Sequence, residues 1–100
     1  MEYDFHFIGA KIPVTIYQTG TVRFSREAVK EYGLENARLR WGVDTKHHVL
    51  AFKKDSLGRK VSGKNQFTTS CPLELAREFV GKFTIELNGE AYVLHRISTE

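Results

Sequence analysis

The sequence predicts a single α+β domain of mainly antiparallel strands with two short helices. Apolar and polar residues alternate with the period of a β-strand in several short segments, while two other segments have helical spacing and end near a glycine. Turn residues separate pairs of the strand segments. A chain of 100 residues, 41% of them hydrophobic and 27% charged, has the size and composition of one globular domain.

The first elements follow from local patterns. Residues 3–7 and 12–16 alternate at a period of two, and residues 22–24 resume the alternation after a turn at Gly20. Residues 25–33 have helical spacing; the serine at their start is a favourable N-cap, and the glycine at their end suits the left-handed position that follows a helix.

Each half of the chain also contains a predicted hairpin. In the first half, residues 44–47 form the loop between two strands. In the second half a helix runs from Pro72 to Gly81, and Asn88-Gly89 is a strong signal for a two-residue turn. Pairing across these turns sets four apolar pairs opposite one another: Trp41 and Leu50, Leu39 and Phe52, Ile85 and Tyr92, and Phe83 and Leu94.

Residues 55–66 lack periodicity and read as a basic linker between two units, residues 12–54 and residues 67–97. Both units have the order strand, helix, glycine, hairpin. This order is compatible with an internal duplication in which Phe24 corresponds to Phe67 and Trp41 to Ile85.

The formal net charge of +3 conceals an uneven distribution, since residues 53–73 carry a net +4 and residues 74–100 a net −2. Arg38, Arg40 and Lys53 are expected on one face of the first hairpin. A basic middle and an acidic end inform on binding partners rather than on fold.

The order of elements in residues 12–54 resembles the swapped-hairpin domain of the AbrB, MazE and SpoVT group. The likeness centres on two stretches, Thr19-Gly20-Thr21-Val22-Arg23-Phe24-Ser25 and Tyr32-Gly33-Leu34-Glu35-Asn36-Ala37. It implies a swapped-hairpin, AbrB-like barrel, a homodimer that exchanges hairpins, and a basic surface that binds double-stranded DNA. It also implies a role as a transcription regulator or an antitoxin. If residues 67–97 are a second copy, the tandem arrangement of MraZ is the nearest likeness.

The chain departs from this family at several positions. Thr21 stands where the family usually has arginine, Ser25 stands where it has proline, and Lys30 alone matches a basic pair in the helix. The alternative is a solvated surface on which charges pair, for instance Glu27 with Lys30. We expect the DNA-contacting residues to be the following: Arg23, Arg26, Lys30, Arg38 and Arg40.

Other motifs have simpler interpretations than the chemistry they suggest. Residues 58–65 have the glycine and lysine spacing of a phosphate-binding P-loop, but Asn65 replaces the Ser or Thr that holds magnesium, and no helix is predicted to follow. His47 and His48 are adjacent, so their side chains are expected to diverge rather than share a metal ion. Cys71 lacks a spaced catalytic partner and is interpreted as a small buried apolar residue.

The sequence therefore predicts a non-catalytic DNA-binding protein that uses no metal and no cofactor. The alternative is a protein-interaction module, antitoxin-like or a phage-encoded adaptor, that binds a partner protein and no nucleic acid. One cysteine excludes an intramolecular disulfide, and no apolar run approaches the ~18 residues of a membrane span. We accordingly expect a cytoplasmic protein.

Overall fold

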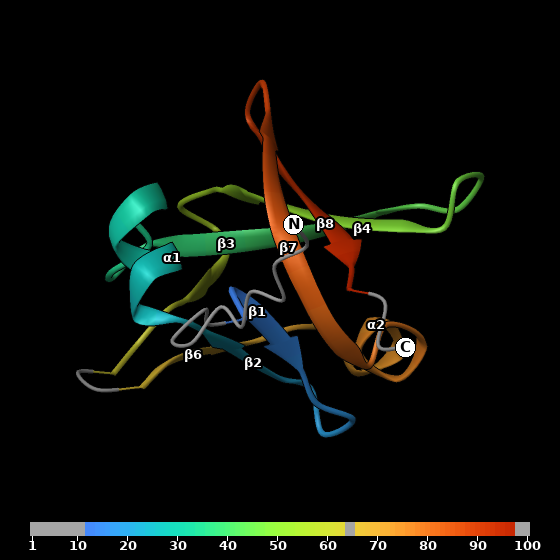
Figure 1. The fold of residues 1–100 in the computed structure, drawn as a ribbon, viewed down its shortest axis with the longest axis horizontal. Helices are drawn as coiled ribbons and strands as arrows, with labels where there is room; N and C mark the ends of the chain where they lie inside the picture. Colours follow the sequence, from blue (N-terminus) through green and yellow to red (C-terminus); the bar gives the residue numbers. More distant parts are fainter. Residues whose placement is uncertain (1–11, 64–65, 98–100) are drawn as a thin grey trace, which may run out of the picture.

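The computed structural model describes residues 12–63 and 66–97, which form one antiparallel sheet curled into a nearly closed barrel with two short helices (Figure 1). The predicted α+β fold class is confirmed; the strand predicted at residues 3–7 lies outside the described residues. The strands and helices are, in chain order, β1 (Val14–Ile16), β2 (Thr21–Phe24), α1 (Arg26–Tyr32), β3 (Arg38–Asp44), β4 (Val49–Lys54), β5 (Arg59–Lys60), β6 (Phe67–Ser70), α2 (Leu73–Glu78), β7 (Gly81–Asn88) and β8 (Ala91–Arg96).

Helix α1 begins and ends as its sequence indicates. The Ser25 hydroxyl accepts a hydrogen bond from the Ala28 N–H at 3.1 Å, which satisfies one of the amides that a helix start leaves unpaired. Gly33 follows the helix with φ +62° and donates its N–H to the Val29 carbonyl. Helix α2 starts after Pro72 and ends before Phe79.

The alternating apolar residues fill the inside of the barrel. Val14, Val22, Leu39 and Leu50 are fully buried, whereas the residues next to them in each strand are more exposed. The aromatic rings pack closely, with the Phe52 ring stacked on Tyr92 at 5.0 Å and edge-on to Phe24 at 5.6 Å. The predicted faces of the strands are therefore correct.

The predicted registers of both hairpins are wrong by two residues. Trp41 pairs with Phe52 rather than Leu50, and Ile85 pairs with Leu94 rather than Tyr92. In the first hairpin the loop is Thr45 to His48, because the Asp44 carboxylate accepts hydrogen bonds from the N–H groups of Lys46 and His47 and His48 takes φ +53°. In the second the turn is Gly89-Glu90, with glycine at φ +64°. Because the error is an even number of residues, every side chain keeps its predicted face.

The segment interpreted as a linker is part of the barrel. Arg59 and Lys60 form β5, which pairs with β3. Val61 is fully buried, and Ser62 bridges to Thr68 of β6. This short strand has only one apolar neighbour to mark it, which explains why periodicity did not reveal it.

The two halves of the chain exchange their hairpins. The strand order is β5-β3-β4-β8-β7-β1-β2-β6, so β3 and β4 lie between strands of the second half, and β7 lies beside β1 of the first half. Exchanging β1 with β5, β2 with β6, β3 with β7 and β4 with β8 maps each strand pair onto another, except that the counterpart of β1–β2 is joined only by the isolated bridge between Ser62 and Thr68. The pairing pattern therefore has approximate two-fold symmetry within one chain.

The registers identify equivalent positions in the two halves. Strand β3 ends at Asp44 and strand β7 ends at Asn88, where each hairpin turn begins. Trp41 and Ile85 each lie three residues before these ends, so they are equivalent, as the sequence predicts. Phe24 and Phe67 are not equivalent; they pair directly with each other. Ser25 and Pro72 are the N-cap residues of α1 and α2, so they are equivalent. Val22 and Thr69 each lie three residues before these N-caps and are therefore equivalent too.

Candidate nucleic-acid interface

Four cationic side chains share the outer face of three neighbouring strands. In β3, Leu39 is fully buried, so Arg38 and Arg40 on either side of it face solvent. Arg40 pairs across the sheet with Lys53 of β4, and Arg38 pairs with Lys60 of β5. Directly paired residues point to the same face, with Cβ atoms about 5 Å apart. We call these four residues, Arg38, Arg40, Lys53 and Lys60, the basic face.

Asp55 is the acidic residue that contacts the basic face. Its Oδ2 lies 3.4 Å from Nη1 of Arg40, whose side chain is 63% exposed, so the pair contributes little stability. Asp55 has a structural role as well, because its Oδ1 accepts a hydrogen bond from the Leu57 N–H at 2.9 Å. That bond, followed by the Arg40 guanidinium, lowers the pKa of the Asp55 carboxyl.

The other cations of the basic face form no ion pair within the part of the chain that the structure describes, although the charge of Lys53 also helps to lower the pKa of the Asp55 carboxyl. Arg38 donates to a neutral acceptor, the Gly58 carbonyl, at 3.3 Å, so its positive charge is not neutralised. Lys53 and Lys60 are exposed and make no ion pair with a described residue. The face therefore presents four positive charges against one negative charge.

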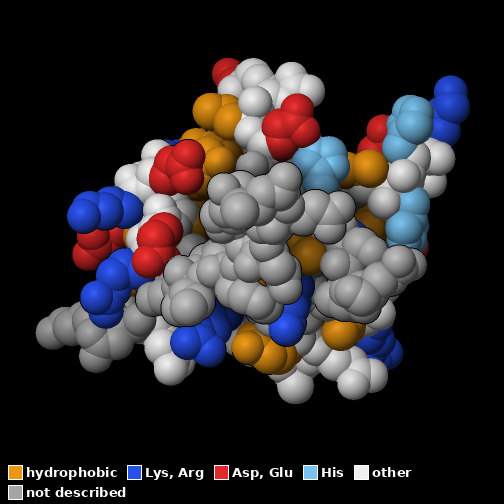
Figure 2. Space-filling view, in the orientation of Figure 1, with side chains coloured by type: hydrophobic (Ala, Val, Ile, Leu, Met, Phe, Trp, Pro, Cys, Tyr) orange, Lys and Arg blue, Asp and Glu red, His pale blue; other side chains and the backbone are white. Residues whose placement is uncertain are grey.

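The remaining predicted site residues lie elsewhere. Arg23 faces outward on β2, which β6 separates from β5. Arg26 and Lys30 lie on α1 together with Glu27 and Glu31, so the helix has no net charge. Figure 2 shows basic and acidic side chains interspersed on the left of the molecule, where Figure 1 places α1. The structure thus brings Arg38 and Arg40 together and leaves the other three apart from them.

Two members of the basic face were missed as site residues. Lys53 was expected on the same hairpin face as the two arginines, and this signal was sufficient to include it. Lys60 could not be found, because its position depends on a two-residue strand that periodicity does not reveal.

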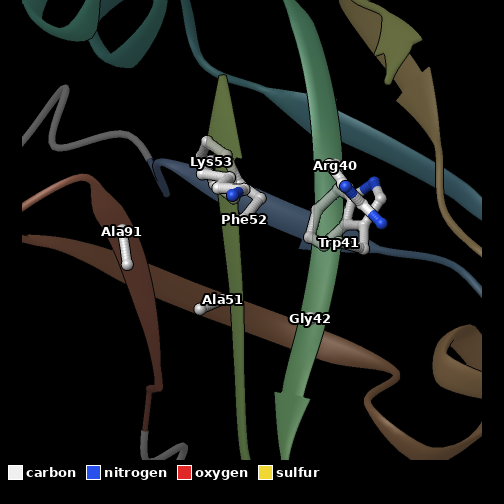
Figure 3. A pocket seen from close by; sticks show the side chains of 7 residues that line it. All are labelled: Arg40, Trp41, Gly42, Ala51, Phe52, Lys53 and Ala91. Atoms are coloured by element: carbon white, nitrogen blue, oxygen red, sulfur yellow. The ribbon is translucent and has the colours of Figure 1, made fainter. Parts of the chain in front are cut away.

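A groove adjoins the basic face on the outside of β3, β4 and β8 (Figure 3). It has a volume of about 420 Å³. Gly42, Ala51 and Ala91 leave it open, and Arg40 and Lys53 lie at its side. Trp41 and Phe52 complete the lining, so the groove combines small residues, two aromatic residues and two cations.

The alternative chemical sites do not assemble among the described residues. Residues 58–63 of the P-loop-like segment contain β5, and the next element is strand β6 rather than a helix. His47 Nδ1 lies 2.8 Å from Asp44 Oδ2, whereas the His48 ring stacks on Phe79 and faces Glu78, so the two imidazoles diverge. Across residues 12–63 and 66–97, no group of three His, Cys, Asp or Glu residues could hold a metal ion. Burial raises the pKa of the Cys71 thiol, which makes it a poor nucleophile.

Comparisons with known proteins give no assignment. No family model, no curated protein and no solved structure matches this chain. Neither α1 nor α2, the helices in the described ranges, has the length and apolar character needed to cross a lipid bilayer.

Proposed function

We propose that this protein binds double-stranded DNA without catalysis, and that the basic face makes the principal phosphate contacts. The observation that carries the proposal is the alignment of four exposed cations on three adjacent strands, with Asp55 as their one acidic contact among the described residues. Adjacent strands lie about 4.8 Å apart, so these charges form a compact cationic surface that suits a polyanion.

The hairpin exchange supports the resemblance to swapped-hairpin DNA binders. In that family two chains exchange hairpins, whereas here the two halves of one chain occupy equivalent places. This arrangement supports the tandem, MraZ-like interpretation. On this basis we extend the proposal to a transcription regulator or antitoxin that acts in the cytoplasm.

The exchange within one chain removes the need for a second copy to complete the barrel. The homodimer that the resemblance implies therefore stays a prediction. Sedimentation equilibrium over a range of protein concentrations tests it, with a single species of one-chain mass as the contradicting result.

The salt dependence of duplex binding tests the proposed function. Each phosphate contact contributes about −0.9 to the slope of log affinity against log salt concentration. Four contacts give a slope of about −3.6, so affinity for a labelled 20-bp duplex should fall about 150-fold between 50 and 200 mM NaCl. No binding at 50 mM, or binding that is indifferent to salt, would contradict the proposal.

A matched pair of double variants locates the contact. Lys53→Gln/Lys60→Gln removes two lysines of the basic face, for which the structure shows no hydrogen bond to a described residue, and should reduce the slope by about 1.8. Lys46→Gln/Lys82→Gln removes the same charge from the hairpin loop and from β7 and should leave the slope unchanged. Equal losses in both variants would refute the assignment to the basic face.

The protein-interaction alternative rests on a different observation. Val43 and Leu87 occupy equivalent positions on the two hairpins and are 39% and 53% exposed. Apolar side chains at such positions suit a protein partner. A stoichiometric partner that is lost on Leu87→Lys, in a protein with no affinity for DNA, would favour this function over the first.

A further inference from the structure

Three small residues on the outside of the sheet, Gly42, Ala51 and Ala91, help to line the groove beside the basic face. Gly42 pairs with Ala51, and Ala91 lies on the neighbouring strand β8. A Cβ added at Gly42 would have no atom within 4 Å, so the space above this residue is open to solvent. A ligand can therefore approach the backbone of β3 closely here.

The equivalent positions in the second half show that this hollow is not a consequence of the fold. Gly42 is equivalent to Glu86, and Lys53 is equivalent to His95. Glu86 Oε2 and His95 Nε2 lie 2.6 Å apart, so at the equivalent place a hydrogen-bonded pair of side chains covers the sheet. In the first half of the chain the sheet thus has an open groove with cations beside it. In the second half the equivalent surface is covered by the side chains of Glu86 and His95.

The residues of the basic face also differ in charge from their equivalents in the other half of the chain. Arg40 is equivalent to Thr84, and Lys60 is equivalent to Thr15. Of the basic face, only Arg38 has a cationic equivalent, Lys82. A two-fold pattern of strands therefore presents one cationic surface and not two.

We infer that the groove formed by Gly42, Ala51 and Ala91 seats one phosphodiester strand of the duplex, with Arg40 and Lys53 contacting its phosphates. The inference deepens the proposed function and rests on it. Arginine donates in a fork that matches two phosphate oxygens, and lysine adds a point charge, while the small residues admit the sugar–phosphate chain between them. Because the equivalent surface is covered by Glu86 and His95, one chain binds one duplex.

Closing the groove without changing charge tests this inference. Gly42→Val places a β-branched side chain on an outward strand position, where it meets no neighbouring atom within 4 Å of its Cβ, so the barrel should fold normally. Fluorescence anisotropy with the labelled 20-bp duplex at 50 mM NaCl should show at least a tenfold loss of affinity. Thr84→Ile is the matched control; it adds apolar bulk on the equivalent face and should bind like the unchanged protein.

The possible outcomes distinguish a failure of the groove assignment from a failure of the proposed DNA binding. If Lys53→Gln/Lys60→Gln reduces the salt slope and Gly42→Val binds normally, the groove assignment is overturned and DNA binding stands. If the unchanged protein has no affinity for the duplex, the proposed function itself fails. A thermal melt confirms that each variant is folded, and titration at concentrations well above the Kd should give one duplex per chain; two duplexes per chain would overturn the asymmetric interpretation.

Discussion

Replacing Thr69 by valine should stabilise the protein. Thr69 lies on β6, is 8% exposed, and has a hydroxyl oxygen with no hydrogen-bond partner among the described residues. Its equivalent position in the first half is Val22, which is fully buried and pairs directly with it. The equivalent site thus shows that the barrel accommodates a valine side chain here.

The magnitude follows from the unpaired hydroxyl. A buried polar group without a partner costs about 1–3 kcal/mol, and valine has nearly the same shape as threonine without that group. We therefore expect Thr69→Val to raise the free energy of unfolding by about 1 kcal/mol or more. For a domain of this size each kcal/mol corresponds to about 4–8 °C in Tm.

Urea denaturation monitored by Trp41 fluorescence measures the change, and the slope m should stay constant. Thr68→Val is the control, since Thr68 is the next residue along the strand, half-buried and outward-facing, and should change stability by less than about 0.5 kcal/mol. A loss of stability in Thr69→Val would refute the reasoning, because it would mean that the hydroxyl makes a hydrogen bond in solution.

Three further predictions concern single titratable side chains. Cys71 is 2% exposed and burial raises the pKa of its thiol, so a disulfide reagent at pH 8 should label it only after unfolding; rapid labelling of the folded protein would contradict this. Asp55→Asn keeps an oxygen that can accept from Leu57 and removes the charge beside Arg40, so duplex affinity at 50 mM NaCl should rise several-fold, and an unchanged affinity would count against the basic face. The hydrogen bonds from His47 lower the pKa of the Asp44 carboxyl; the stability it contributes is present above its unfolded pKa and lost as pH falls through the folded pKa. The urea midpoint should therefore fall more below pH 4 in the unchanged protein than in Asp44→Asn.

Local periodicity was sufficient to predict which side chains face the core. The alternation around Leu39 and Phe83 marks the buried face of each strand, and Ser25 and Gly33 mark the ends of α1, because these signals depend only on neighbours in the chain. Register was not predictable to the same degree. A shift of two residues preserves every face, and the correct choice depends on hydrogen bonds such as those from Lys46 and His47 to the Asp44 carboxylate.

In the candidate site, too, some residues could be placed from local periodicity and others only from the pairing of distant strands. Arg38 and Arg40 share a strand face by alternation alone, and hairpin pairing adds Lys53 to the same face, so the sequence was sufficient to group these three residues. Lys60 joins them only because β5 pairs with β3, and Gly42 opens a groove only because β8 brings Ala91 alongside β4. The sequence by itself thus determined the fold class, most of the core and the shared face of Arg38, Arg40 and Lys53, whereas only the tertiary structure decided which strands are neighbours and that Val61 is buried. The physical reason is that periodicity is a local property of the chain, while the pairing of distant strands is chosen by the packing of the whole barrel.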